Sequence, residues 1–175
     1  GDFIIPETVK LNKVSYLVTS IGLEAFFECS SLTSIVIPNS VKSIGKGAFG
    51  GCTSLTSVVI SDSVESIGYW AFCECTNLKD VYITDIGKWC EIEFGHIGNP
   101  FYYADTLYLN GEEVTEITVP EGITRIGNDA FKDYEKLTSI TIPDSVSSIG
   151  EEAFCGCSNL CSTCCKSGHK TCLID

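Results

Sequence analysis

Short alternating runs of apolar residues, rather than long helical stripes, dominate the hydrophobic pattern of this chain. The first clear run follows Leu32 and places Ile35 and Ile37 on one face of an extended segment. Pro38 ends this run, because proline lacks the amide donor that a strand ladder needs. A second extended piece follows at 41–44, and a glycine turn then leads into an Ala-Phe pair that predicts about one helical turn.

This run belongs to a repeat of 23 residues. An Ile-Gly pair marks each copy, at 21–22, 44–45, 67–68, 126–127 and 149–150. An Ala-Phe pair follows at a fixed distance, at 25–26, 48–49, 71–72, 130–131 and 153–154. Each copy then reaches a leucine, at Leu32, Leu55, Leu78, Leu137 and Leu160. Five copies exceed the three or so that stacked repeats need for stability.

The repeat predicts a leucine-rich-repeat solenoid. The pattern L-x-x-I-x-I is a strand signature of such repeats, in which each coil contributes one short strand to a parallel ladder. We therefore expect a right-handed, β-rich stack of short parallel strands joined by short helical or 3-10 turns. The apolar positions of each copy should face the inside of the coil.

Cysteines occupy one fixed place in the repeat, three residues before the leucine. These are Cys29, Cys52, Cys75 and Cys157, and the fourth copy has Tyr134 there. A small apolar side chain suits a crowded interior. We predict that the four cysteines are buried thiols.

The full motif, I-G-x-x-A-F-x-x-C-x-x-L-x-x-I-x-I-P-x-x-V, resembles the BspA-type leucine-rich repeats, also called the Treponema pallidum type. The resemblance covers roughly residues 20–84 and 114–160. It implies a surface or secreted protein of a bacterium or protist that takes part in adhesion or host-protein binding. The family has no shared catalytic residues, so the resemblance implies a binding role.

The repeat is interrupted between the third and fourth copies. Gly68 and Gly127 are 59 residues apart, which is two periods plus thirteen. We assign the excess to an insertion at 84–113, in which Asn110-Gly111 is a strong hairpin signal. We expect a short helix or turn and then a hairpin. Two aromatics of the insertion, Tyr102 and Tyr103, are candidate partner-binding residues, and the alternative is that the insertion is a packed decoration that merely bends the solenoid.

Two further departures fall in the first and third copies. The segment from Pro6 to Gly22 is nine residues longer than the segment from Pro38 to Gly45, and it predicts a hairpin that covers the open N-terminal end. In the third copy, Tyr69-Trp70 replaces small or polar residues. We expect this pair to pack against the insertion; the alternative is an exposed aromatic anchor for a partner.

The division of the single domain follows from these breaks. Residues 1–20 form an N-terminal cap hairpin, 21–83 and 114–160 are repeats, 84–113 is the insertion and 161–175 is a cysteine-rich tail. The tail contains Cys161, Cys164, His169 and Cys172, which are weak candidates for a zinc site because their spacing is short. Disulfides that cap the end, or a loosely ordered tail, are the alternatives, so we assign no cofactor.

The composition limits the kinds of partner that we expect for this chain. Eleven Lys and Arg against 23 Asp and Glu give a net charge of −12, which disfavours nucleic acid. No apolar run is long enough to cross a bilayer, so we expect no membrane insertion. We find no catalytic motif, and Cys90 near His96 is a poor thiol-imidazole candidate, so we expect no enzyme.

A binding surface is expected on the outward face of the strand ladder. The outward positions form two rows: Ser34, Ser57, Asp80, Glu116 and Ser139, and beside them Val36, Val59, Tyr82, Thr118 and Thr141. Val36, Val59, Asp80, Tyr82, Glu116 and Thr118 are our candidate partner-binding residues. We therefore predict a protein-binding module of a cell-surface or secreted protein whose partner is a host or extracellular-matrix protein. The alternative is a spacer that holds other domains apart.

Overall fold

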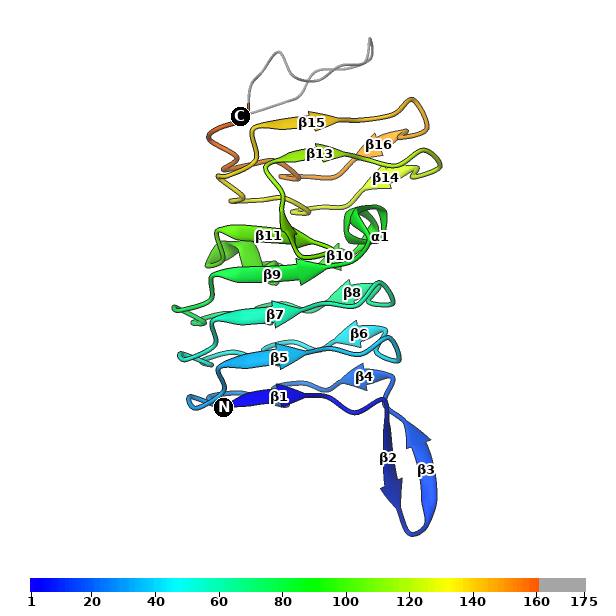
Figure 1. The fold of residues 1–175 in the computed structure, drawn as a ribbon, viewed down its shortest axis with the longest axis vertical. Coiled ribbons are helices and arrows are strands. Elements are labelled where there is room, and N and C mark those ends of the chain that lie inside the picture. Colours follow the sequence, from blue (N-terminus) through cyan, green and yellow to red (C-terminus); the bar gives the residue numbers. More distant parts are fainter. Residues whose placement is uncertain (161–175) are drawn as a thin grey trace.

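The structure is a computed structural model, and it describes residues 1–160. The chain winds into a stack of coils, and each regular coil contributes one strand to each of two ladders. Residues 1 and 160 therefore lie at opposite ends of the stack (Figure 1). The predicted leucine-rich-repeat solenoid with short parallel strands is confirmed.

The front ladder is a six-stranded sheet in the order β1-β5-β7-β9-β11-β12. Its members are β1 (Asp2–Ile4), β5 (Ser34–Val36), β7 (Ser57–Val59), β9 (Asp80–Ile83), β11 (Thr106–Leu109) and β12 (Glu112–Glu113). The second ladder is formed by β4 (Ser20–Ile21), β6 (Ser43–Ile44), β8 (Ser66–Ile67) and β10 (Glu93–Phe94). Two smaller parallel sheets follow, from β13 (Glu116–Thr118) with β15 (Ser139–Thr141), and β14 (Arg125–Ile126) with β16 (Ser148–Ile149).

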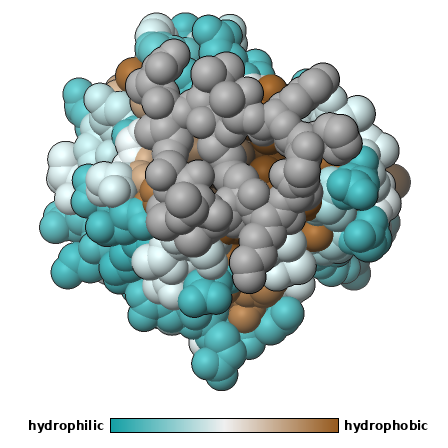
Figure 2. Space-filling model, turned by 90° about the horizontal axis from the view of Figure 1, so that it is seen from above, coloured by the Kyte–Doolittle hydropathy of each residue, from teal (hydrophilic) through white to brown (hydrophobic). Residues whose placement is uncertain are grey.

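The repeated phenylalanine forms the centre of the core. The rings of Phe26, Phe49 and Phe72 stack from coil to coil at centroid distances of 5.3 and 5.2 Å. Phe131 and Phe154 continue the pattern in the last coils at 5.6 Å. The buried residues form one apolar core. Hydrophilic residues occupy most of the periphery in the view from the C-terminal end of the stack (Figure 2). Each coil therefore depends on its neighbours for burial of its ring.

The repeated cysteine has a defined partner in the neighbouring coil. The thiols of Cys52, Cys75 and Cys157 each donate to the carbonyl oxygen of the phenylalanine one coil earlier, at 3.0–3.1 Å. These three thiols are buried, as predicted. The prediction was wrong for Cys29, which is exposed because it lies in the outermost described coil and no described coil covers its outer side.

The segment 84–113 forms a coil rather than a loop outside the stack. After β9, helix α1 (Ile86–Glu91) begins at Asp85, whose carboxylate accepts from the amide of Lys88. Strand β10 then pairs with β8, and β11 pairs with β9 in register, so this segment adds one enlarged turn of the solenoid. The 3-10 helix η1 (Pro100–Tyr102) lies between them. The predicted short helix and the hairpin at Asn110-Gly111, formed by β11 and β12, are both confirmed.

Side chains replace part of the backbone ladder where this coil meets the next one. Between regular coils the amide of Phe26 donates to the carbonyl of Ala48 at 2.7 Å. At the junction the equivalent carbonyl, that of Ala130, accepts from the indole of Trp89 at 2.8 Å and from the side-chain amide of Asn99 at 3.1 Å. The enlarged coil is thereby joined to the next coil although their strands do not pair.

Tyr134 occupies the cysteine position at this junction. Its ring stacks on Phe101 at a centroid distance of 4.6 Å, and its hydroxyl donates to the carbonyl of Val114. The preceding coil is longer than a regular coil, so a thiol would not span the same space. The tyrosine therefore compensates for the inserted residues.

The N-terminal hairpin is present but does not cover the end of the stack. Strands β2 (Thr8–Leu11) and β3 (Val14–Leu17) pair in antiparallel register and project away from the coils (Figure 1). Every residue of both strands is exposed. The expected covering role was wrong, because both strands of the hairpin are exposed over their whole length and extend away from the coils (Figure 1), whereas β1 ahead of them joins the front ladder.

Candidate functional site

The front ladder aligns a stripe of apolar side chains on its outward face. Its register pairs Ile4 with Val36, Val36 with Val59, Val59 with Tyr82, and Tyr82 with Tyr108. We call these five residues the strand-side stripe. Ile4 is exposed and the other four are half-buried, so their outer atoms form a continuous apolar strip across five strands.

The two tyrosines form the widest part of the strand-side stripe. Their rings stack at a centroid distance of 4.6 Å with an interplanar angle of 11°. Burial against each other and the nearby carboxylate of Asp80 raise the pKa of the Tyr82 hydroxyl. Both rings present flat, rigid contact area at low entropic cost.

Charged side chains border the tyrosine pair. The ammonium of Lys136 lies 3.1 Å from a carboxylate oxygen of Glu113 and 3.6 Å from one of Asp105, and it donates to the hydroxyl of Thr106 at 2.7 Å. Burial, and then repulsion from Asp105, raise the pKa of Asp80. The border is therefore acidic, with one lysine already paired.

The expected rows do not continue directly from Asp80 and Tyr82 to Glu116 and Thr118. The last steps are as expected, because Glu116 aligns with Ser139 and Thr118 with Thr141. Glu116 and Thr118 are exposed, but they lie on β13, which belongs to the separate β13–β15 sheet. Thr106 and Tyr108 of β11 take the places beside Asp80 and Tyr82 instead. The sequence contains a signal for the pairing of β11 with β9, because Thr-Leu-Tyr-Leu at 106–109 repeats the alternation of Asp-Val-Tyr-Ile at 80–83.

Large side chains also gather on the turns between the second ladder and the front ladder. Tyr69 is 57% exposed and Trp70 is 43% exposed, so the expectation that they pack against the insertion was wrong. The close contact is made by backbone instead: the amide of Trp70 donates to the carbonyl of His96 at 3.0 Å. The glycine at 95 permits this approach, since a Cβ there would lie 2.5 Å from the amide of Tyr69.

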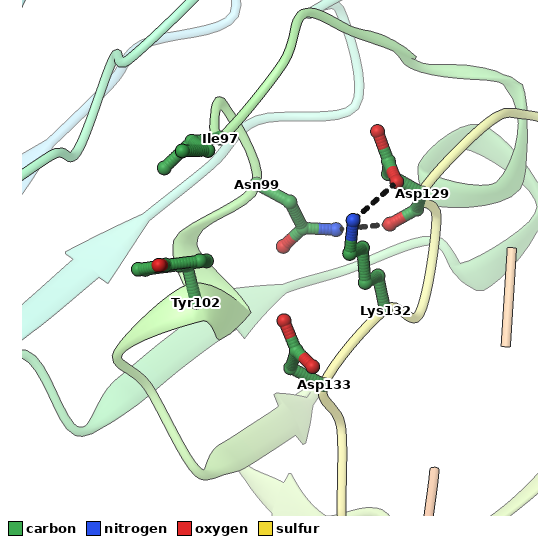
Figure 3. A pocket seen from close by; sticks show the side chains of 6 residues that line it. All are labelled: Ile97, Asn99, Tyr102, Asp129, Lys132 and Asp133. Carbon is green, nitrogen blue, oxygen red and sulfur yellow. Dashed lines mark hydrogen bonds and ion pairs between the residues drawn. The ribbon is translucent and has the colours of Figure 1, made fainter. Parts of the chain in front are cut away.

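The two tyrosines of the enlarged coil have different environments. Tyr103 is half-buried and its hydroxyl accepts from the amide of Glu74 at 3.0 Å, whereas Tyr102 is half exposed. Tyr102 borders a small pocket at the junction (Figure 3). The other residues that line it are Ile97, Asn99, Asp129, Lys132 and Asp133. An ion pair between Lys132 and Asp129, at 3.5 Å, occupies one side of the pocket, which leaves room only for water-sized molecules.

The remaining chemical candidates do not assemble into a reactive site. Burial raises the pKa of the Cys90 thiol to about 12, so this thiol is protonated at neutral pH, which disfavours a nucleophilic role. Across residues 1–160, no three His, Cys, Asp or Glu side chains are grouped to hold a metal ion. The candidates Cys161, Cys164, His169 and Cys172 lie outside the described residues.

The parallel ladders, the stacked phenylalanines and the 23-residue coils define a leucine-rich-repeat protein. A family model for the BspA type leucine-rich repeat region, with six copies, matches residues 7–95 and 103–172. The chain belongs to the BspA-type leucine-rich-repeat family. Repeat domains of this kind are generally non-catalytic protein-interaction modules.

Solved structures agree with this assignment. A leucine-rich repeat protein from Bacteroides ovatus is 32% identical over 91% of this chain and 38% of that chain, with a TM-score of 0.54. A leucine rich cell surface protein from Faecalibacterium prausnitzii is 29% identical over 92% of this chain and 46% of that chain, with a TM-score of 0.51. The T. pallidum leucine rich repeat protein, at 22% identity over 93% of this chain and 79% of that chain, shares the fold with a TM-score of 0.56.

The chain thus spans less than half the length of two of these proteins. None of the curated proteins matches it. Within residues 1–160, the single α-helix is far too short to cross a bilayer.

Proposed function

We propose that this chain is a non-enzymatic protein-binding module of a cell-surface or secreted protein, and that its strand-side stripe contacts a host or extracellular-matrix protein. The observation that carries the proposal is the register that aligns Ile4, Val36, Val59, Tyr82 and Tyr108 across five strands. A contiguous apolar strip with an acidic border is typical of an interface core with a polar rim.

The Tyr82–Tyr108 pair is the expected hot spot of this surface. Tyrosine is enriched among residues that dominate binding energy, and a stacked pair loses little conformational freedom when a partner docks. The acidic border, together with the net charge of −12, favours a partner with basic groups and speeds the encounter.

A similar protein supports the proposed location at the cell surface or outside the cell. The similar protein from Faecalibacterium prausnitzii is described as a leucine rich cell surface protein. By analogy we place this chain at the cell surface or outside the cell. The second candidate is a spacer, favoured by the elongated stack of coils that separates residue 1 from residue 160 (Figure 1).

The proposal is tested by binding to immobilised extracellular-matrix proteins, measured by surface plasmon resonance. The variant Tyr82→Ala/Tyr108→Ala should weaken binding about 30-fold, which corresponds to a loss of about 2 kcal/mol. The matched control is Tyr102→Ala, which removes an equally large, half-exposed tyrosine from another face. Its affinity should equal that of the parent chain.

Two outcomes would contradict the proposal. Equal binding by the parent chain and by Tyr82→Ala/Tyr108→Ala would exclude the strand-side stripe. If the parent chain binds no matrix protein, the spacer remains the better candidate. Circular dichroism of each variant ensures that lost binding is not lost folding.

A further inference from the structure

A second apolar surface lies on the turn side of the solenoid, away from the strand-side stripe. We call Leu23, Phe27, Tyr69 and Trp70 the turn-side patch. Leu23 is 66% exposed and Phe27 is 49% exposed, which is comparable to Tyr69 and Trp70. Because soluble proteins seldom gather large apolar side chains on one surface, such a patch marks an interaction site.

The members of the patch lie on stacked turns. The amide of Glu24 donates to the carbonyl of Lys46, and the amide of Gly47 donates to the carbonyl of Tyr69, both at 2.9 Å. Leu23, Lys46 and Tyr69 therefore occupy the same outward position on three successive coils. The outward direction belongs to this position in the repeat, so the exposure of Leu23 does not depend on its being near the end of the stack.

The middle one of these three turns, residues 46–51, contains three glycines. Gly47, Gly50 and Gly51 carry no side chains, and a Cβ at Gly50 would lie 3.1 Å from the ring of Phe27. Phe27 thus lies against the middle turn, and the side chains of Glu24 and Glu28 lie against Gly47 and Gly51 in the same way. Lys46 is the exposed long side chain of the middle turn, and it stands between the apolar residues of the first and third turns with its ammonium over the Trp70 ring.

The backbone at Trp70 is held in an unusual conformation. Its φ is 58°, in the left-handed region that favours glycine and small polar residues. Equivalent turns carry Glu24, Gly47, Asp129 or Glu152 at this place. The left-handed conformation therefore belongs to this position of the repeat, and Trp70 fills it with a large side chain that stays 43% exposed.

The charges around the patch select the partner. Glu24, Glu28 and Glu74 lie on the same turns, against the single ammonium of Lys46, which gives a local net charge of −2 (three carboxylates and one ammonium). Lys46 lies 4.6 Å from the centroid of the Trp70 ring, a cation–π contact. The patch therefore combines apolar and aromatic area with an excess of carboxylates.

We propose that the turn-side patch binds a polypeptide segment that carries apolar side chains together with arginine or lysine. The apolar side chains of the bound segment contact Leu23, Phe27, Tyr69 and Trp70. Its arginine or lysine side chains pair with the glutamates at the edge of the patch. This surface is distinct from the strand-side stripe, so the chain has two protein-binding faces.

The experiment uses a synthetic 12-residue peptide that alternates leucine and arginine as the probe, titrated into the full chain. Trp70 is 43% exposed and Trp89 only 1%, so quenching of fluorescence by acrylamide reports on Trp70. We expect saturating peptide to protect Trp70 from acrylamide. The variant Leu23→Ser/Tyr69→Ser should bind the peptide at least tenfold more weakly.

Matched controls separate this surface from general attraction to an acidic protein. Leu11→Ser/Tyr16→Ser, at two exposed residues of the N-terminal hairpin, should change affinity less than twofold. Peptides that alternate leucine with glutamate or serine with arginine should bind far more weakly. The proposal is overturned if acrylamide still quenches Trp70 at saturation, or if Leu11→Ser/Tyr16→Ser weakens binding as much as Leu23→Ser/Tyr69→Ser. Failure here leaves the matrix-binding test of Tyr82 and Tyr108 untouched.

Discussion

The indole nitrogen of Trp89 lies 2.8 Å from the carbonyl oxygen of Ala130, in the place where a backbone amide donates between regular coils. The tryptophan is 1% exposed and its ring also packs against Phe94 and Phe101. One side chain therefore fills the enlarged coil and continues the hydrogen bonding between coils.

Replacing Trp89 with phenylalanine should destabilise the fold by about 1–3 kcal/mol. The change deletes the donor to Ala130, leaves only the longer bond from Asn99, and opens a small cavity. The free energy of unfolding in urea measures the effect. Trp70→Phe, made at the exposed tryptophan, is the matched control and should change stability by about 0.5 kcal/mol or less.

Gly45 should not tolerate alanine. A Cβ at this position would lie 2.7 Å from the carbonyl carbon and 2.8 Å from the carbonyl oxygen of Gly22, both backbone atoms that cannot move aside. We expect a loss of about 1–3 kcal/mol in the free energy of unfolding.

The same change at Gly22 is the control for Gly45→Ala. Gly22 holds the equivalent position in the first coil and has nothing within 4 Å of its added Cβ. A thermal unfolding midpoint for Gly22→Ala that falls as far as that of Gly45→Ala would show that the clash between coils is not the cause.

Deleting residues 9–17 should leave the solenoid intact. The deletion joins Thr8 to Val18 and yields Pro-Glu-Thr-Val-Thr-Ser-Ile-Gly, which has the length and pattern of Pro-Asn-Ser-Val-Lys-Ser-Ile-Gly at 38–45. Since both hairpin strands are exposed, little burial is lost, and shortening the loop lowers its closure entropy. The free energy of unfolding should change by about 1 kcal/mol or less. Loss of the cooperative thermal unfolding transition would mean that the hairpin supports the coils.

Alkaline pH should weaken the fold through its buried thiols. Burial raises the pKa of Cys75 from 9.0 to about 12, so the folded chain keeps a proton that the unfolded chain loses. The unfolded state binds fewer protons in this range, and stability therefore falls as the pH rises from about 9 toward about 12. The free energy of unfolding, measured from pH 8 to pH 10.5 by urea titration, should fall more steeply for the parent chain than for Cys75→Ala. If the free energies of unfolding of the parent chain and of Cys75→Ala fall equally with pH, the Cys75 thiol is not the cause.

The repeat made the fold predictable because each copy has the same neighbours. Once Ile35, Phe49 and Leu55 were placed in one coil, the same positions followed in the others, and they are buried as expected. The periodic signal failed where the neighbours differ. Cys29 shares the motif of Cys52, but it lacks a described coil on its outer side and is exposed.

The strand-side stripe was only half predictable. Val36, Val59 and Tyr82 are spaced by 23 residues, and the register aligns them as expected. Tyr108 follows Tyr82 by 26 residues, so strict periodicity passes over it, although the sequence around it repeats that of β9. The exposure of Tyr69 and Trp70 depends on a close backbone approach at Gly95, which no hydrophobic pattern encodes.

The break between the two pairs of ladders gives the molecule a mechanical weak point. Within each block, strands resist separation through rows of backbone hydrogen bonds, whereas the junction relies on Trp89, Asn99 and Tyr134 together with the backbone bond from Gly127 to Cys90. Under a tensile load along the stack, the junction would bear the load with fewer hydrogen bonds than the sheets on either side of it. The enlarged coil would therefore separate from the coil that follows it before the strands within the sheets separate. A tethered chain of this kind would yield in two stages, extending at the junction while the strand-side stripe, which lies wholly on one side of it, stays in one piece.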